Sequence, residues 1–198
     1  MKAGLATFLG VVLMVSSAMA QDRVAEVFTN TCLARFPDFK NIDTARYAPF
    51  MALDADPLAP PGLPLITSTR STVWLVGSPT KKSPDDFALQ VSEGTFLERP
   101  ARGCLVAGIA GDTSREEALL THFQTNQFIG ETKQSLLPGY RYWLVERGGQ
   151  KALFGISQIG GAFGAASATL ALVVPDPDVA QQFADMLANE KKNQAPEN

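Results

Sequence analysis

The chain has little of what the commonest enzyme mechanisms require. Its 198 residues include one histidine and two cysteines, with no C-x-x-C spacing. A structural or catalytic zinc site needs a set of suitably spaced Cys and His ligands, so the sequence predicts no such centre. It also lacks G-x-S-x-G, the turn that carries the nucleophilic serine of α/β hydrolases. We therefore predict no catalytic residue, no metal ligand and no cofactor.

Any histidine-dependent mechanism would have to use His122, which lies between Leu119 and Phe123. We interpret it as a residue at the border of an apolar face that makes one hydrogen bond; the alternative is a catalytic base.

Basic residues are also in the minority, with 17 Lys and Arg against 20 Asp and Glu. A nucleic-acid or anionic-membrane surface needs a basic excess, so neither partner is expected. No run after the first 20 residues approaches the length and apolar character of a membrane span.

The first 20 residues have the pattern of a secretory signal peptide. Lys2 is followed by an apolar run and by small residues at Ala18 and Ala20, which predicts cleavage before Gln21. An uncleaved N-terminal anchor is the alternative. The expected location is the periplasm, and the mature chain would keep 16 basic and all 20 acidic residues, a net charge near −4.

Both cysteines, Cys32 and Cys104, lie in the exported part. An even number of cysteines in an oxidising compartment favours a disulfide between them. Because the bond would close a long loop, it would stabilise the protein by roughly 3–4 kcal/mol. Two buried thiols are the competing interpretation.

The segment ISQIGGAFGAASATLALVV, residues 156–174, is rich in glycine and alanine. Phosphate-binding glycine loops open a helix, whereas these glycines lead into a strand-like run that ends at proline. We interpret Gly160, Gly161 and Gly164 as a long hairpin loop. The alternative is a small-residue surface that a ligand or partner approaches closely.

Four pairs of neighbouring acids are the only other catalytic candidates. We assign them capping, turn or solvated roles rather than the paired-carboxylate role of a glycosidase. The pairs are Asp54/Asp56, Asp85/Asp86, Glu116/Glu117 and Asp176/Asp178. We interpret Trp74 and Trp143 as core residues, because strand tryptophans beside Leu-Val are typical of a core. The alternative is that they stack on a sugar or peptide ligand.

Hydrophobic periodicity predicts three main helices: residues 22–36, ended by Pro37; residues 116–129, with a Thr113/Glu116 capping box and Gly130 as stop; and a last helix capped by Asp176. A short helical piece is expected over 43–50. Six strands are predicted, at 71–77, 86–92, 103–110, 140–146, 151–157 and 167–174, with a hairpin at Arg147-Gly148-Gly149-Gln150. The proline-rich arm 52–66 is interpreted as an extended surface strap, or alternatively as a lid or partner-binding arm.

Two halves of the chain look alike, because Trp-Leu-Val occurs at 74–76 and again at 143–145. The fold expected is α+β, a mainly antiparallel sheet of about six strands with three helices, because short turns join the strands. The two halves, 22–110 and 113–174, are either an αβββ repeat or similar by coincidence. The domain would span 21–188, followed by a disordered tail over 189–198.

The combination F-x-x-x-C-L-x-x-F-P-x-F (28–39) with Gly-Cys-Leu-Val (103–106) resembles a group of small exported proteins of alphaproteobacteria with no assigned function. The resemblance implies a Cys32–Cys104 pair and a periplasmic address, and no activity. We expect a non-enzymatic domain that binds a protein or small ligand in the cell envelope. The rival hypotheses are a cell-envelope hydrolase with dispersed carboxylates and a structural envelope component without a defined ligand.

Overall fold

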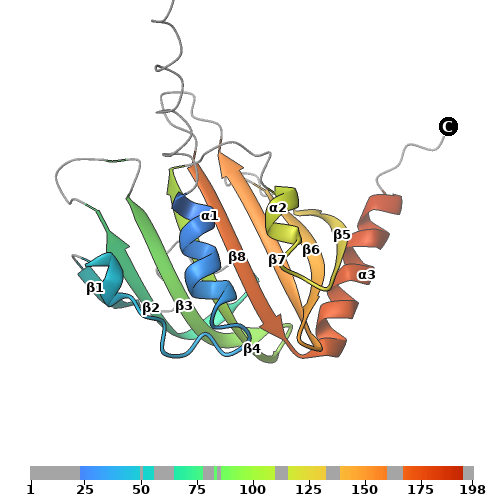
Figure 1. The fold of residues 1–198 in the computed structure, drawn as a ribbon. Helices are drawn as coiled ribbons and strands as arrows, with labels where there is room; N and C mark the ends of the chain where they lie inside the picture. The colour runs from blue at the N-terminus through green and yellow to red at the C-terminus, as the bar shows by residue number, and fades with distance from the viewer. Residues whose placement is uncertain are drawn as a thin grey trace, which may run out of the picture.

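The computed structural model describes residues 23–49, 51–55, 65–77, 83, 86–109, 116–132, 139–159 and 167–193. Figure 1 shows one broad twisted sheet with helices on both faces. The predicted signal peptide 1–20, residues 56–64 of the proline-rich arm and the glycine segment 160–166 lie outside this part of the chain.

Within the described residues the sheet contains eight strands in the order β1-β2-β3-β4-β8-β7-β6-β5, and every neighbouring pair is antiparallel. The antiparallel α+β class is therefore confirmed, with more strands than the six predicted. The strands are β1 (Met51–Ala55), β2 (Thr67–Val76), β3 (Phe87–Phe96), β4 (Arg99–Ile109), β5 (Thr125–Thr132), β6 (Tyr140–Arg147), β7 (Gln150–Ile159) and β8 (Ser167–Pro175).

All six predicted strands are present as β2, β3, β4, β6, β7 and β8, and the predicted hairpin joins β6 to β7. Gly148 and Gly149 both have positive φ, 59° and 77°, which a two-residue hairpin turn of this kind requires. The edge strands β1 and β5 were not predicted.

The helix expected over 116–129 is the main error. Only α2 (Glu116–Leu120) is helical, and residues 125–132 instead pair with β6. Gly130 does not end a helix: with φ +149° it lies where the register shifts, and a Cβ there would lie 3.2 Å from Cβ of Leu187. Pairing with β6 thus decides the structure of a segment whose apolar spacing is ambiguous.

The other helices lie close to the predicted positions. The first is split into α1 (Arg23–Phe28) and the π-helical η1 (Thr29–Leu33), the short piece is the 3₁₀ turn η2 (Ala45–Tyr47), and the last is α3 (Pro177–Asn193), which continues past residue 188. Asp176 caps α3, because its Oδ1 accepts from the backbone N–H of Asp178 at 3.0 Å. No helix in the described ranges is long and apolar enough to cross a membrane.

Alternation along the strands gives the sheet two apolar faces, each with its own core. The face covered by α1 and α2, here the α1 face, buries side chains such as Trp143, Phe154 and Leu172. The opposite face, here the α3 face, buries Leu153 and Val173 against α3. Figure 1 shows α1 crossing the middle of the sheet and α3 beside β5.

The register across the middle of the sheet is symmetric. In the β4–β8 ladder Leu105 faces Ala171, with Val106↔Leu170 on one side and Cys104↔Leu172 on the other. A twofold operation through the Leu105/Ala171 pair exchanges β1-β2-β3-β4 with β5-β6-β7-β8 in this ladder. The operation brings Trp74, paired with Leu89, onto Trp143, paired with Phe154.

Candidate functional site

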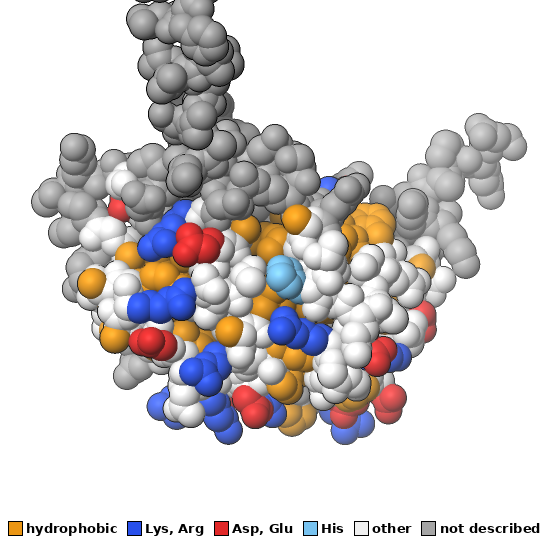
Figure 2. All heavy atoms as spheres, in the orientation of Figure 1, with side chains coloured by type: hydrophobic (Ala, Val, Ile, Leu, Met, Phe, Trp, Pro, Cys, Tyr) orange, Lys and Arg blue, Asp and Glu red, His pale blue; other side chains and the backbone are white. Residues whose placement is uncertain are grey.

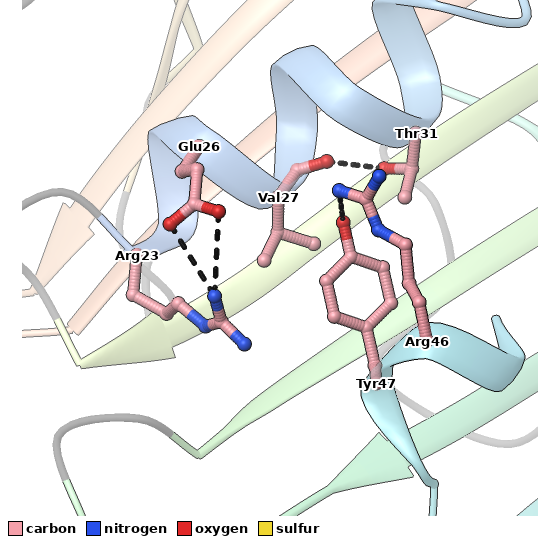
Figure 3. Close-up of polar contacts among 6 residues, drawn as sticks. All are labelled: Arg23, Glu26, Val27, Thr31, Arg46 and Tyr47. Carbon is pink, nitrogen blue, oxygen red and sulfur yellow. Dashed lines mark hydrogen bonds and ion pairs between the residues drawn. The ribbon is translucent and has the colours of Figure 1, made fainter. Parts of the chain in front are cut away.

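The disulfide fixes the helical segment to the sheet on the α1 face. Cys32 and Cys104 are both fully buried and are bonded, with their Cα atoms 5.5 Å apart. The preceding residue, Thr31, donates its hydroxyl to the carbonyl oxygen of Val27 at 2.6 Å, a bond drawn in Figure 3. The predicted pair is confirmed, and it holds α1 and η1 against β4.

Beside α1, the turn η2 places a tyrosine on the core. The ring of Tyr47 is 8% exposed and meets the ring of Phe87 edge-on, with centroids 5.3 Å apart. Ala48 ends the turn in the left-handed conformation, at φ 46°. The aromatic pair forms an apolar floor at this end of β3.

Two arginines lie against that floor from different elements. The guanidinium carbon of Arg23, on α1, is 5.5 Å from the ring centroid of Tyr47 and 5.7 Å from that of Phe87. The guanidinium carbon of Arg46, on η2, is 4.5 Å from the Tyr47 centroid. Figure 3 shows the two arginines on opposite sides of Tyr47. We call Arg23, Arg46, Tyr47 and Phe87 the arginine–aromatic cluster.

The charges of the cluster are only partly paired. Nη1 of Arg23 lies 3.3 Å from a carboxylate oxygen of Glu26, while its buried Nε has no hydrogen-bond partner among the described residues. Arg46 is exposed and donates to the hydroxyl of Tyr47, and within the described ranges it has no carboxylate partner. Guanidiniums stacked on aromatic rings are held in place with other N–H groups left to bind an anion.

Figure 2 shows this face of the molecule. Hydrophobic side chains reach the surface there among basic side chains (Lys and Arg) and acidic ones (Asp and Glu). Another ion pair on it joins Arg102 to Asp38 and bridges β4 to the segment after η1. Oppositely charged groups are interspersed here.

The remaining candidates from the sequence are scattered. His122 is exposed in the turn after α2, with its backbone N–H bonded to the carbonyl of Leu119. Trp143 is in the core, as predicted, whereas Trp74 is partly buried at its edge. Within the described part of the chain no three His, Cys, Asp or Glu side chains gather as a metal site would need.

The acidic pairs that the structure describes have local roles. Asp176 caps α3, and Oδ2 of Asp86 accepts from the backbone N–H of Ser83 at 2.7 Å in the turn before β3. The side chains of Asp54, Glu116 and Glu117, and all of Asp56 and Asp85, lie outside the described part, so their roles stay predictions.

A buried polar network on the α3 face was missed by the sequence analysis. Nε2 of Gln90 donates to Oγ of Ser71 at 2.8 Å and to Oγ of Ser92 at 3.1 Å, and the two hydroxyl oxygens are 2.8 Å apart. Alternation in β3 was the available signal, since it places Gln90 and Ser92 on the face opposite Leu89. Gln90 and Ser71 are 19 residues apart, and only the register brings them together.

Two tyrosines lie stacked on the same face at the start of β6. The rings of Tyr140 and Tyr142 are 5.8 Å apart at 22°. Burial raises the pKa of the Tyr140 phenol, opposed by a hydrogen bond with Thr169. Burial, and then the neighbouring Tyr140, raise the pKa of Tyr142 still further, against a hydrogen bond with Thr132. Both are therefore neutral hydroxyls near pH 7.

Comparisons with family models, curated proteins and solved structures found no match for this chain.

Proposed function

We propose that the protein is an exported, non-enzymatic domain, and that its arginine–aromatic cluster binds a carboxylate or phosphate group of a small ligand or partner protein in the periplasm. The observation that carries the proposal is the stacking of Arg23 and Arg46 on Tyr47. The stacking reduces the entropy that each side chain would lose on binding.

Export is supported by the N-terminal sequence and by the disulfide. The pattern of residues 1–20 is that of a signal peptide, and Cys32–Cys104 is compatible with an oxidising compartment. N-terminal sequencing of the protein recovered from the periplasm tests this part: a chain that starts at Gln21 is expected, and one that retains residue 1 contradicts it.

Anion binding at the cluster can be tested with two simple probes, inorganic phosphate and acetate, titrated into the mature protein and followed by the NMR signals of the arginine Nε–H groups. We expect the signals of Arg23 and Arg46 to shift. Tighter binding of phosphate would indicate a phosphorylated ligand, and tighter binding of acetate a carboxylate.

Arg46→Gln should weaken binding of the anion, followed by the shift at Arg23, by roughly 10- to 150-fold, because a charge-assisted hydrogen bond is worth about 1.5–3 kcal/mol. Arg70→Gln is the matched control: it removes the same charge from an exposed site on β2, away from the cluster. Equal losses in both variants, or no shift with either probe, would overturn the proposal.

We further propose that the two halves of the sheet arose by duplication, each as a helix followed by four strands rather than three. The strand order, in which β1-β2-β3-β4 and β5-β6-β7-β8 run inward from the two edges to meet at β4 and β8, and the equivalent positions of Trp74 and Trp143 support this. A separately expressed half, residues 116–193, tests it: formation of a twofold dimer through β8 is expected, and a persistently unfolded chain counts against it.

A further inference from the structure

The two edges of the sheet differ in how they are protected against pairing with another strand. β1 lies at one edge and β5 at the other (Figure 1). β1 is five residues long and its sequence includes Asp54, and short, charged strands are what natural proteins place at exposed edges. β5 is eight residues long, and its first six, 125–130, include no charged residue and no proline. The edge at β5 therefore lacks the protection that β1 has.

The first part of β5 is regular, exposed and paired on one side. Residues 125–128 pair with 146–143 of β6 in unbroken register, and the register shifts only beyond Phe128. All four residues are exposed, and β6 is the one strand that β5 pairs with among the described residues. A strand paired on one side presents a row of backbone N–H and C=O groups on the other. This segment is therefore a template for a further strand.

The rest of β5 is held in place by α3. Ile129 is buried in the core of the α3 face, and a Cβ on Gly130 would lie 3.2 Å from Cβ of Leu187. The helix thus packs against β5 beyond Phe128 and leaves the regular part of the strand exposed. Because β5 is already ordered, a strand that pairs with it meets little entropic cost on this side.

Exposed apolar side chains gather at the same edge. Phe128 is 47% exposed, although its ring lies 5.3 Å from that of Trp143 and the guanidinium carbon of Arg141 lies 5.6 Å from it. Met186, on the helix that packs against β5, is 45% exposed. Two of the three large hydrophobic side chains exposed in the described part of the chain are therefore on β5 and α3. Such side chains beside an open strand mark an association site.

The occupant that this edge fits is a second copy of the chain. Two β5 strands can pair antiparallel about a twofold axis perpendicular to the sheet, which makes the two sheets continuous. This operation keeps each face on its own side, so both Phe128 rings lie on the α1 face of the joined sheet. Pairing of β5 with β1 of another copy would leave open edges and grow into a filament. Because β1 is the protected edge, a closed dimer is favoured instead.

We propose that the protein forms a twofold dimer in which the β5 strands of two copies pair antiparallel, centred at Gln127. In this register Phe128 of each copy is opposite Asn126 of the other, and the two Phe128 rings are diagonal neighbours that cover each other's exposed parts. Only uncharged residues, 125–129, face one another across the junction. The interface shares no residue with the arginine–aromatic cluster and does not depend on the function proposed for that cluster.

Sedimentation velocity of the mature, disulfide-bonded protein over a range of concentrations tests the dimer. A reversible monomer–dimer equilibrium is expected. Gln127→Lys should raise the dimer dissociation constant about tenfold or more, because it places two like charges opposite each other at the axis. Ala52→Lys is the matched control: it adds the same charge at an exposed position of the other edge strand, β1, and its dissociation constant should equal that of the wild type.

Amide hydrogen exchange identifies the strand that pairs. In the wild type, the amides of residues 125–128 that do not bond to β6 should exchange more slowly as the concentration rises, and in Gln127→Lys this protection should be lost. The melting temperature of the dilute variant should equal that of the dilute wild type, which shows that the monomer still folds. If Gln127→Lys does not fold, Thr125→Lys takes its place, because its charge lies beside the same junction.

Four results would overturn the proposal. They are a protein that stays monomeric up to about 0.1 mM, a dimer that the lysine on β5 leaves intact, a dimer that Ala52→Lys weakens equally, and species that keep growing beyond the dimer.

Discussion

Trp74 and Trp143 occupy equivalent positions in the two halves of the sheet but differ in their cover. Trp143 is 4% exposed and contacts the rings of Phe154 and Phe128, at 6.0 and 5.3 Å between centroids. Trp74 is only partly buried at the edge of the same core. The two tryptophans therefore have the same position in the strand pairing but different degrees of burial.

The difference predicts unequal costs of truncation. Trp143→Ala should lower the free energy of unfolding by about 3–5 kcal/mol, the range for a fully buried large aromatic side chain, because it leaves a cavity beneath Phe128. Trp74→Ala, the matched variant, should cost clearly less because solvent already reaches part of its ring. Urea denaturation of both variants measures this, and equal losses would contradict the burial difference.

The disulfide should be a large single contribution to stability. The replacement of Cys32 and Cys104 together by alanine should lower the free energy of unfolding by about 2–5 kcal/mol, since the bond closes a loop between residues 72 apart. Denaturation of the oxidised protein, the reduced protein and the double variant provides the comparison. Reduction of the wild type should cause most of the same loss in free energy of unfolding, and it should leave the stability of the double variant unchanged. A reduced wild type as stable as the oxidised form would refute this.

The hydrogen bonds of Gln90 with Ser71 and Ser92 predict that the losses of stability on removing these side chains are not additive. Gln90→Ala should cost about 1–3 kcal/mol, because Ser71 and Ser92 each lose a donor in a buried position. In the triple variant, with both serines also changed to alanine, the cost should be smaller than the sum of the single costs, because no hydroxyl is left without a partner. Thermal denaturation of the three single variants and the triple variant measures the coupling, and strictly additive costs would argue against a network.

The predicted strands can be recognised from their own residues, whereas the missed strands cannot. β2, β3, β4, β6, β7 and β8 carry runs of apolar and β-branched residues bounded by turn residues, which is enough to place them. β1 precedes a proline-dense stretch and holds two residues, Asp54 and Ala55, that are unfavourable in strands. β5 has helix-compatible spacing, and only its pairing with β6 makes it a strand.

The candidate sites could be predicted even less. Arg23, Tyr47 and Phe87 come from three elements, and no spacing in the sequence marks them as neighbours. The open edge at β5 cannot be recognised until the strand order is known. Cys32–Cys104 was predictable because only one pairing of two cysteines exists.

Alkaline pH should destabilise the protein through the stacked tyrosines. Burial raises the folded-state pKa of Tyr140 above the ordinary value of 10.0, and that of Tyr142 is raised further. An acid with a raised folded-state pKa contributes its full stabilisation below the unfolded-state pKa and loses it as pH rises through the folded-state pKa.

Stability should therefore be insensitive to these two groups below about pH 9 and fall above about pH 10, where tyrosines of the unfolded chain ionise first. Lysines titrate in the same range, so the useful quantity is the difference between the wild type and Tyr142→Phe in one set of urea denaturations. Phenylalanine cannot ionise, so the variant should lose less stability than the wild type above pH 10. Parallel pH profiles would show that Tyr142 ionises equally easily in both states and would contradict the effect of its burial.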